Sequence, residues 1–141
     1  MKSVQFRSGC PVSSLLDLIG DKWTMLVIRD IALFDKHTFN EFLQSEEAIA
    51  TNILSDRLNK LCDERILERG RHNESKAKIY YKLTKRGIDL VPLLLEMAIW
   101  SDRHLPIDKK AKAFVKSVKE NKPEVLKKIQ AKLSALHQAL K

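Results

Sequence analysis

Residues 49–69, IATNILSDRLNKLCDERILER, read as one helix that runs directly into one strand. Leu54, Leu58 and Leu61 recur at the spacing of one face of an α-helix, with Cys62 beside them, so this face is expected to pack in the core. The opposite face is polar, with Arg57 at its edge. Its members are Asn52, Ser55, Asp56, Asn59 and Lys60. The stretch therefore predicts an amphipathic helix with a polar outer face.

A second, shorter helix is predicted just upstream. Residues 38–41, TFNE, have the form of a capping box, in which a Thr hydroxyl and a Glu carboxylate accept hydrogen bonds from the first backbone N–H groups of a helix. This helix is expected to end near Gln44. Two helices joined by a turn and followed by a strand form a helix-turn-helix layout, whose second helix enters the major groove of DNA. We call this second helix, which follows Ile49, the reader helix.

A basic β-hairpin is predicted after the reader helix. Residues 66–70 and 78–83 have the composition of strands, and residues 71–77 form the polar loop between them. A basic hairpin in this position is a wing, which contacts the DNA backbone or enters the minor groove. The expected DNA-contacting residues of the hairpin are Arg69, Arg71, His72, Lys76 and Lys78.

The polar face of the reader helix has residue types that suit base readout. Short hydroxyl, amide and carboxylate side chains can hydrogen-bond to base edges, and each good bidentate contact discriminates by about 1–3 kcal/mol. Arg57 and Lys60 are expected to bind phosphates, and Asp56 either accepts from a cytosine amino group or pairs with one of these two cations. The expected base-facing residues are Thr51, Asn52, Ser55, Asp56 and Asn59. The alternative is an ordinary solvated helix face.

The charge is segregated along the chain. The net charge of the 141 residues is +8, and residues 57–86 and 109–141 are basic islands of net charge +6 and +8 in a mildly acidic frame. Such segregation is typical of a surface that binds a polyanion, although Lys-rich helices are also often merely solvated. The sequence has no apolar run that could span a membrane and no signal peptide, so a cytoplasmic protein is expected.

No pattern of a catalytic or metal site is found. The two cysteines lie in unrelated contexts, the four histidines lack ligand spacing, and no nucleophile–base set or phosphate-binding loop is present. The sequence therefore predicts neither an enzyme nor a cofactor. Cys62 lies on the apolar stripe of the reader helix, so core packing is expected for it.

The remaining helices predict a dimer. A long helix is expected from Thr84 through Trp100, apolar nearly all round, so it needs two packing partners. One partner is the chain's own core, and the other is either a second subunit, which we favour, or the C-terminal tail. The residues expected at the dimer interface are Val12, Leu15, Leu94, Met97 and Trp100.

Two further helices are predicted in the tail. One is capped by Asp108 and the other opens at Glu124, and a heptad-like pattern of leucines in the second requires packing on the body or on a partner. The expected domain division is residues 1–106, a winged helix-turn-helix DNA-binding and dimerisation domain, and residues 107–141, a Lys-rich helical extension. The fold class is mostly α with a small β-hairpin.

Several short motifs follow one another along the chain. They are Cys10-Pro11, Gly20-Asp21-Lys22-Trp23, Phe39-Asn40-Glu41-Phe42, the stretch from Ile49 to Leu58, Ile66-Leu67-Glu68-Arg69, and Tyr81-Lys82-Leu83-Thr84 with Gly87. In this order and spacing they make the chain resemble the HxlR family of winged-helix regulators. The resemblance covers residues 10–100 and implies a dimeric DNA-binding repressor or activator. The chain departs from the family pattern at Ala48, where a glycine is usual, at Thr38, where a basic residue is usual, and in the wing tip, where a proline is absent.

The resemblance also makes Cys10 a candidate sensor. In some members of the family a cysteine at this N-terminal position is modified by oxidants or electrophiles, and Lys22 or Arg7 nearby would favour its thiolate. The alternative is a packing role beside the dimer helices. The sequence thus predicts a regulator that binds duplex DNA as a homodimer, with a small-molecule or oxidant as a candidate effector. The alternatives are a non-specific basic DNA-binding protein and a winged helix that binds another protein.

Overall fold

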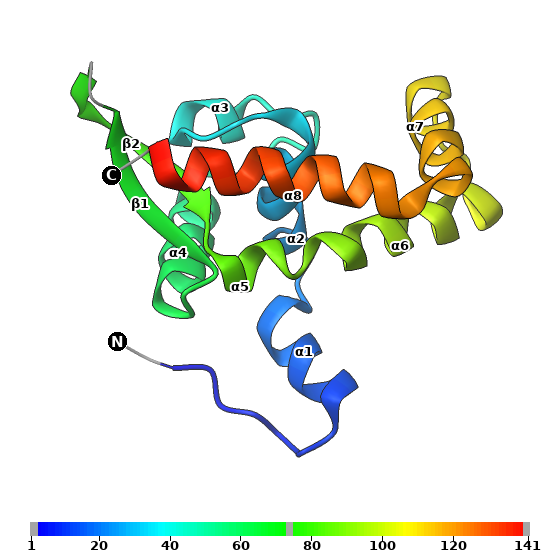
Figure 1. Ribbon diagram of the computed structural model, residues 1–141. Coiled ribbons are helices and arrows are strands. Elements are labelled where there is room, and N and C mark those ends of the chain that lie inside the picture. Colours follow the sequence, from blue (N-terminus) through cyan, green and yellow to red (C-terminus); the bar gives the residue numbers. More distant parts are fainter. Residues whose placement is uncertain (1–2, 73–74, 140–141) are drawn as a thin grey trace.

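The computed structural model describes residues 3–72 and 75–139, and the side chains of residues 72–76 and 137–139 are outside that description. The chain is mostly helical with one antiparallel two-stranded sheet, as the sequence predicts (Figure 1). The elements follow one another in the order α1 (Pro11–Ile19), α2 (Thr24–Phe34), α3 (Phe39–Leu43), α4 (Thr51–Asp63), β1 (Leu67–His72), β2 (Ser75–Leu83), α5 (Lys85–Ile88), α6 (Val91–His104), α7 (Lys109–Glu120) and α8 (Lys122–Ala139).

Capping groups that the sequence predicts set the starts of two helices. The Thr38 hydroxyl accepts a hydrogen bond from the backbone N–H of Glu41 at 3.2 Å, and the Glu41 carboxylate accepts from the N–H of Thr38 at 3.0 Å. The capping box of α3 is therefore confirmed. The Asp108 carboxylate accepts from the N–H of Ala111 at 2.8 Å, which confirms it as the cap of α7.

The helix predicted to run from Thr84 to Trp100 is instead two helices. The first, α5, ends at Ile88, and α6 begins at Val91. Pro92 explains the break, because a proline has no N–H to donate to the carbonyl of Ile88 four residues earlier. Beyond the break, α6 extends from α5 across the molecule toward α7 (Figure 1).

The predicted hairpin is present, with longer strands than expected. Strand β1 reaches His72 and β2 begins at Ser75, where the sequence predicts strands over residues 66–70 and 78–83. The pairing is antiparallel, with a register shift after Arg71. The strands extend nearly to the tip of the hairpin, so the basic residues assigned to the loop lie on or beside the sheet.

The hairpin is anchored on the segment before α3. The backbone N–H of Tyr81 donates to the carbonyl of His37 at 2.7 Å, so this segment lies along β2. The Tyr81 ring packs against Phe42 of α3, with ring centroids 6.1 Å apart. Gly87 lies under the other end of the sheet, where a Cβ would be 2.3 Å from the carbonyl oxygen of Ile66. Only glycine lets α5 approach the strand this closely.

The core lies between α2, α4, the sheet and the C-terminal helices. The apolar stripe of α4 is buried, as predicted, and it meets buried side chains of α2 and β1. The side chains of this core that are less than 2% exposed include Phe42, Ile28, Ile31, Leu54, Leu58, Leu61, Ile66, Leu67, Leu83 and Val91.

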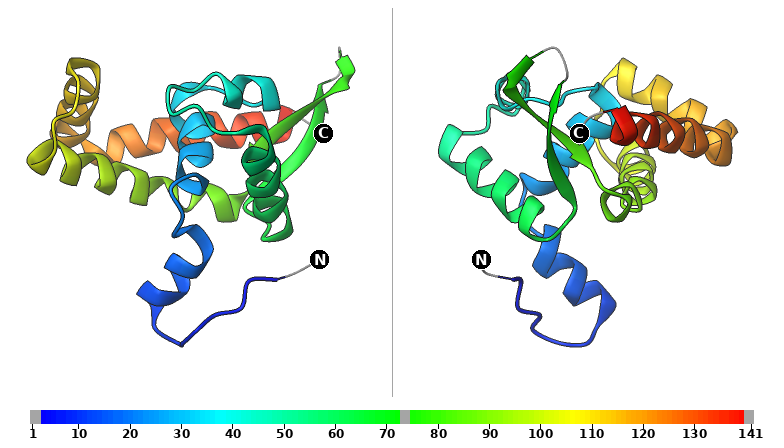
Figure 2. Two further views of the ribbon diagram at one scale, coloured as in Figure 1. Left: turned by 180° about the vertical axis from the view of Figure 1, so that it is seen from behind. Right: turned by 60° about the vertical axis from the view of Figure 1, so that its left-hand side comes forward.

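The two tail helices pack on the body of the same chain. The last helix, α8, begins at Lys122, two residues before the predicted Glu124, because Pro123 is tolerated in the first turn. It runs alongside α2 and β2, and Leu133 is buried in the common core (Figures 1 and 2). The sequence left open whether the tail packs on the body or on a partner, and these contacts place it on the body.

The tail covers only part of α6. Val115 and Val118 of α7 are buried against this region, and Leu94 of α6 is buried in the core of its own chain. Met97 and Trp100 remain 47% and 58% exposed on the free side of α6. Among the helices of residues 3–72 and 75–139, none is long and apolar enough to cross a membrane.

Candidate nucleic-acid interface

The reader helix, α4, presents its polar face to solvent. The side chains expected to face bases are all exposed, while Arg57 and Lys60 are half-buried. The exposed set comprises Thr51, Asn52, Ser55, Asp56 and Asn59. Because the apolar stripe on the other side is buried, the helix cannot rotate to hide these residues, and their outward direction is fixed by the core.

Arg57 is paired with two carboxylates of its own chain. Its Nε atom donates to Asp21 Oδ1 at 3.0 Å, and its Nη1 atom donates to Asp56 Oδ2 at 2.5 Å. The side chain is only 24% exposed. The sequence predicts that Arg57 binds a phosphate; in the structure its charge is balanced by two carboxylates of the same chain. The pairing with Asp56 is one of the two alternatives that the sequence left open for that carboxylate.

Asp21 accepts hydrogen bonds both from Arg57 and from the start of α2. Its carboxylate accepts from the backbone N–H groups of Trp23 and Thr24 at 2.8 and 2.9 Å, as a cap of α2. Partial burial raises the pKa of Asp21, but the hydrogen bonds from Thr24, Arg57 and the backbone outweigh burial and hold this pKa well below its ordinary value. Asp21 is therefore ionised at neutral pH.

The turn between α3 and α4 is fixed by a second polar network, which sequence reasoning missed. Asp30 of α2 is 3% exposed, and its Oδ2 atom accepts from the Ser45 hydroxyl at 2.6 Å. Arg29 donates to Asp30 Oδ1 at 2.7 Å and to both oxygens of Glu47 at 2.8 and 2.9 Å. Ser45 and Glu47 lie 15 to 18 residues from their partners in the sequence, so no local pattern indicates them.

The same turn contains a residue in a left-handed conformation. Ala48 has a φ of 56°, a value that suits glycine and costs an alanine about 1–2 kcal/mol. This is the position where the chain departs from the glycine usual in the family. The network around Asp30 therefore holds a strained turn in place, and the turn sets where α4 begins.

The hairpin is tied to the reader helix. Arg69 of β1 donates to the Asn59 side-chain oxygen at 2.5 Å, and its guanidinium lies over the Tyr81 ring, 5.7 Å from the centroid. Arg71 and Lys78 are exposed on the strands. The side chains of His72 and Lys76, which we also expected to contact DNA, lie outside the described residues.

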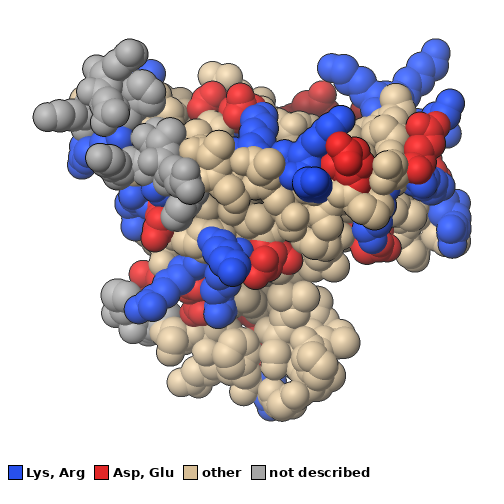
Figure 3. Space-filling view, in the orientation of Figure 1, with Lys and Arg blue, Asp and Glu red and all other residues tan. Residues whose placement is uncertain are grey.

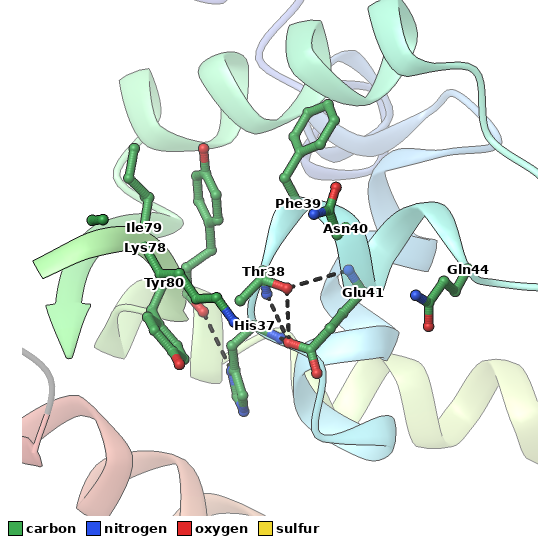
Figure 4. A pocket seen from close by; sticks show the side chains of 11 residues that line it. His37, Thr38, Phe39, Asn40, Glu41, Gln44, Lys78, Ile79 and Tyr80 are labelled. Atoms are coloured by element: carbon green, nitrogen blue, oxygen red, sulfur yellow. Dashed lines mark hydrogen bonds between the residues drawn. The ribbon is translucent and has the colours of Figure 1, made fainter. Parts of the chain in front are cut away.

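A groove of about 680 Å³ separates β2 from α3 (Figure 4). His37 lies at its base, where Nε2 is 2.9 Å from Asp35 Oδ1, and Glu41 is engaged in the capping box. Asn40 and Lys78 line its sides. The groove is open to solvent, and the polar side chains of His37, Thr38 and Glu41 in it are hydrogen-bonded within the chain.

A second, apolar groove of about 540 Å³ lies between α1, α2 and α6. Leu15 and Met97 line it, and Val12 and Leu16 of α1 are 67% and 52% exposed beside it. The part of the molecule that includes α1 shows little charge (Figure 3). Of the residues expected at a dimer interface, Val12, Leu15 and Met97 line this groove, and Trp100 is exposed one turn further along α6. Leu94 is buried in its own core and is not available for an interface.

The two cysteines have different surroundings. Cys10 is exposed at the residue that precedes α1, and Cys62 is half-buried, packed against the core. Burial raises the pKa of the Cys62 thiol. Within residues 3–72 and 75–139, no cluster of His, Cys, Asp and Glu could hold a metal ion.

Comparison with known proteins identifies the arrangement. The family model described as HxlR-like helix-turn-helix matches residues 18–109. The chain belongs to the HxlR family. The match includes all of the helix-turn-helix motif, the hairpin and α6, and it ends at the first residue of α7.

Three similar proteins illustrate the relationship. The HTH-type transcriptional regulator YdeP of Bacillus subtilis is 31% identical over 96 residues, which are 68% of this chain and 74% of YdeP. The redox regulator HypR in its oxidised form is 30% identical, with a TM-score of 0.59, and the match covers 70% of this chain and 100% of HypR. Quinone-bound YodB of B. subtilis is 29% identical, with a TM-score of 0.54, and the match covers 67% of this chain and 99% of YodB. This HxlR protein is thus a winged-helix transcriptional regulator.

Proposed function

We propose that this HxlR protein binds a specific duplex operator as a homodimer, with α4 in the major groove and the hairpin on the flanking backbone. The observation that carries the proposal is the exposed row of amide and hydroxyl side chains on α4, flanked by basic residues on the hairpin. The residues proposed to approach bases are Thr51, Asn52, Ser55 and Asn59, and those proposed to approach phosphates are Lys60, Arg69, Arg71 and Lys78.

The proposal is tested by comparing duplexes. Binding to the DNA upstream of the protein's own gene is measured against a random duplex of equal length across a salt series, and a library selection locates the operator if that region is not bound. A preference of about 10³ or more at physiological salt is expected of a specific regulator. Equal binding to every duplex would favour a non-specific basic protein, and no binding would favour a winged helix that recognises another protein.

Individual residues are tested on the operator found in this way. Asn52→Ala is expected to lower affinity for the operator by about 1–3 kcal/mol and to relax specificity at one base position. Lys78→Ala is expected to weaken binding to all sequences alike. If Asn52→Ala and Ser55→Ala left the operator preference unchanged, the reader face would be wrongly assigned.

The second subunit is proposed to pack on the apolar groove between α1, α2 and α6. Val12, Leu16, Met97 and Trp100 are large apolar side chains that are each about half exposed or more in one chain. A contiguous apolar surface of this kind is typical of an interface. Two-fold packing at this groove would pair the two reader helices for successive major grooves. Sedimentation should give a dimer, and Leu16→Asp with Met97→Asp should give a folded monomer.

Cys10 is proposed to sense oxidants or quinones. The support is its exposure next to α1, together with the redox regulator HypR and quinone-bound YodB among the relatives. We expect a quinone or diamide to modify Cys10 and to change operator affinity, and Cys10→Ser to abolish the change. Cys62→Ala is the matched control, because its half-buried thiol with a raised pKa is less reactive. An unchanged response in Cys10→Ser would rule out this role.

A further inference from the structure

The N-terminal segment, residues 3–23, contacts the end of the reader helix. The backbone N–H of Val4 donates to Glu64 Oε1 at 2.8 Å, and the Val4 side chain packs against the core. Glu64 is the C-cap residue directly after α4. This bond joins residues 60 positions apart, so the start of the chain is attached where the reader helix stops.

The other end of the segment contacts the middle of the reader helix. Arg57 of α4 donates to Asp21, which also caps α2. Gly20, the C-cap of α1, is the one residue between that helix and Asp21. A displacement of α1 therefore reaches Asp21 through one residue and not through a long linker.

The segment between these two contacts is held together by its own ion pair. Arg7 donates from Nε to Asp17 Oδ1 at 2.5 Å, and its backbone N–H donates to Asp17 Oδ2 at 3.0 Å. The irregular residues before Cys10 are thereby attached to α1. The segment thus forms a closed loop from the end of α4, through α1, back to the middle of α4.

We infer that Asp21 and Glu64 are positioning residues, which fasten the N-terminal segment to the reader helix so that a displacement of α1 is passed to α4. Neither residue faces DNA in the proposed complex; each acts through its contact with the segment. The inference deepens the proposed function, because Cys10 immediately precedes α1 and α1 carries part of the proposed dimer surface. It rests on that function for its effect on DNA, but the mechanical link itself can be measured without DNA.

The test perturbs α1 and follows α4. A bulky maleimide is attached to Cys10 in a Cys62→Ala background, and hydrogen exchange is measured for the amides of residues 54–63. In the parent, labelling should change these exchange rates by about fivefold or more, the lower end of usual couplings between sites. In the double variant Arg57→Met, Glu64→Ala, which cuts both contacts but keeps the caps of α2, the change should fall below about twofold.

Two further variants distinguish a lost connection between α1 and α4 from a general loss of folded structure. Asp56→Asn removes the other carboxylate of Arg57 and leaves the link to Asp21, so it should respond to the label like the parent. Asp21→Asn keeps an acceptor for the caps of α2 but removes the charge, so it should respond less, even if the double variant fails to fold. An equal response in Asp21→Asn and the parent, or no response of α4 in the parent, would overturn the inference. Failure of operator binding would not change the exchange result, so the two proposals fail separately.

Discussion

Replacing Leu133 with alanine tests whether α8 is part of the folding core or an appendage. Leu133 is 3% exposed and belongs to the same buried cluster as α2 and the sheet. A buried Leu→Ala change costs about 2–5 kcal/mol, from the lost transfer free energy and the cavity left behind. We expect the free energy of unfolding to fall by about 3 kcal/mol, which is a large part of the stability of a domain of this size.

The assay is urea unfolding followed by circular dichroism and by the fluorescence of Trp23 and Trp100. With an m-value of about 2 kcal/mol per M, the midpoint should fall by about 1.5 M, and the two signals should still change together. The matched control is Leu105→Ala, because Leu105 is 51% exposed, and its free energy of unfolding should fall by less than about 0.5 kcal/mol. A decrease below about 1 kcal/mol for Leu133→Ala, or a separate early transition of the tail, would refute the view that α8 shares the core.

Three further predictions concern the turn, the junction and the hairpin. Ala48→Gly should raise the free energy of unfolding by up to about 1 kcal/mol, since glycine relieves the left-handed strain but adds entropy to the unfolded state. Ala113→Gly, at an exposed position of α7, should instead lower the free energy of unfolding by about as much. The midpoints of urea unfolding compare the two variants. Asp21→Asn should destabilise most near neutral pH, because a depressed carboxyl pKa contributes stability that is fully present above the unfolded value of about 4. This stability is lost progressively as the pH falls from there toward the folded pKa. The difference in the free energy of unfolding between the two proteins should therefore be about constant from about pH 7 to 5 and should shrink from about pH 4 to 2. Replacing Arg71 and Lys78 by glutamine should reduce the slope of log affinity against log salt concentration by about 0.9 for each phosphate that is no longer neutralised. The control replaces the exposed lysines of α7, which lies at the far end of the molecule from the hairpin (Figure 1). On a short operator, this control should leave the slope unchanged.

Features encoded over a few residues could be predicted from the sequence. The stripe of Leu54, Leu58 and Leu61 and the capping box at Thr38 depend on neighbours in the chain, and both are found as expected. The exposure of the polar face of α4 follows from the stripe, because the two faces of a helix cannot both be buried against one core.

Features that depend on distant partners could not be predicted. The side chain of Arg57 is drawn inward by Asp21, 36 residues earlier, and nothing near Arg57 indicates this. The network from Arg29 to Glu47 likewise forms only when α2 meets the turn before α4. Leu94 was assigned to an interface because α6 is apolar on all sides, and only the packed structure distinguishes its buried face from the face that bears Met97.

The engagement of Arg57 has a consequence for how such a regulator changes its targets. The side chains proposed to face bases carry no positive charge, and the cations proposed to meet phosphates lie mainly on the hairpin. In the proposed complex, discrimination between sequences and overall attraction to DNA therefore come from different elements of the chain. Substitutions at Asn52 or Ser55 would then change the preferred operator without changing the sequence-independent affinity for DNA. Substitutions in the hairpin would change that affinity without changing the preferred operator. Gene duplicates of this regulator would be free to diverge in these two properties independently.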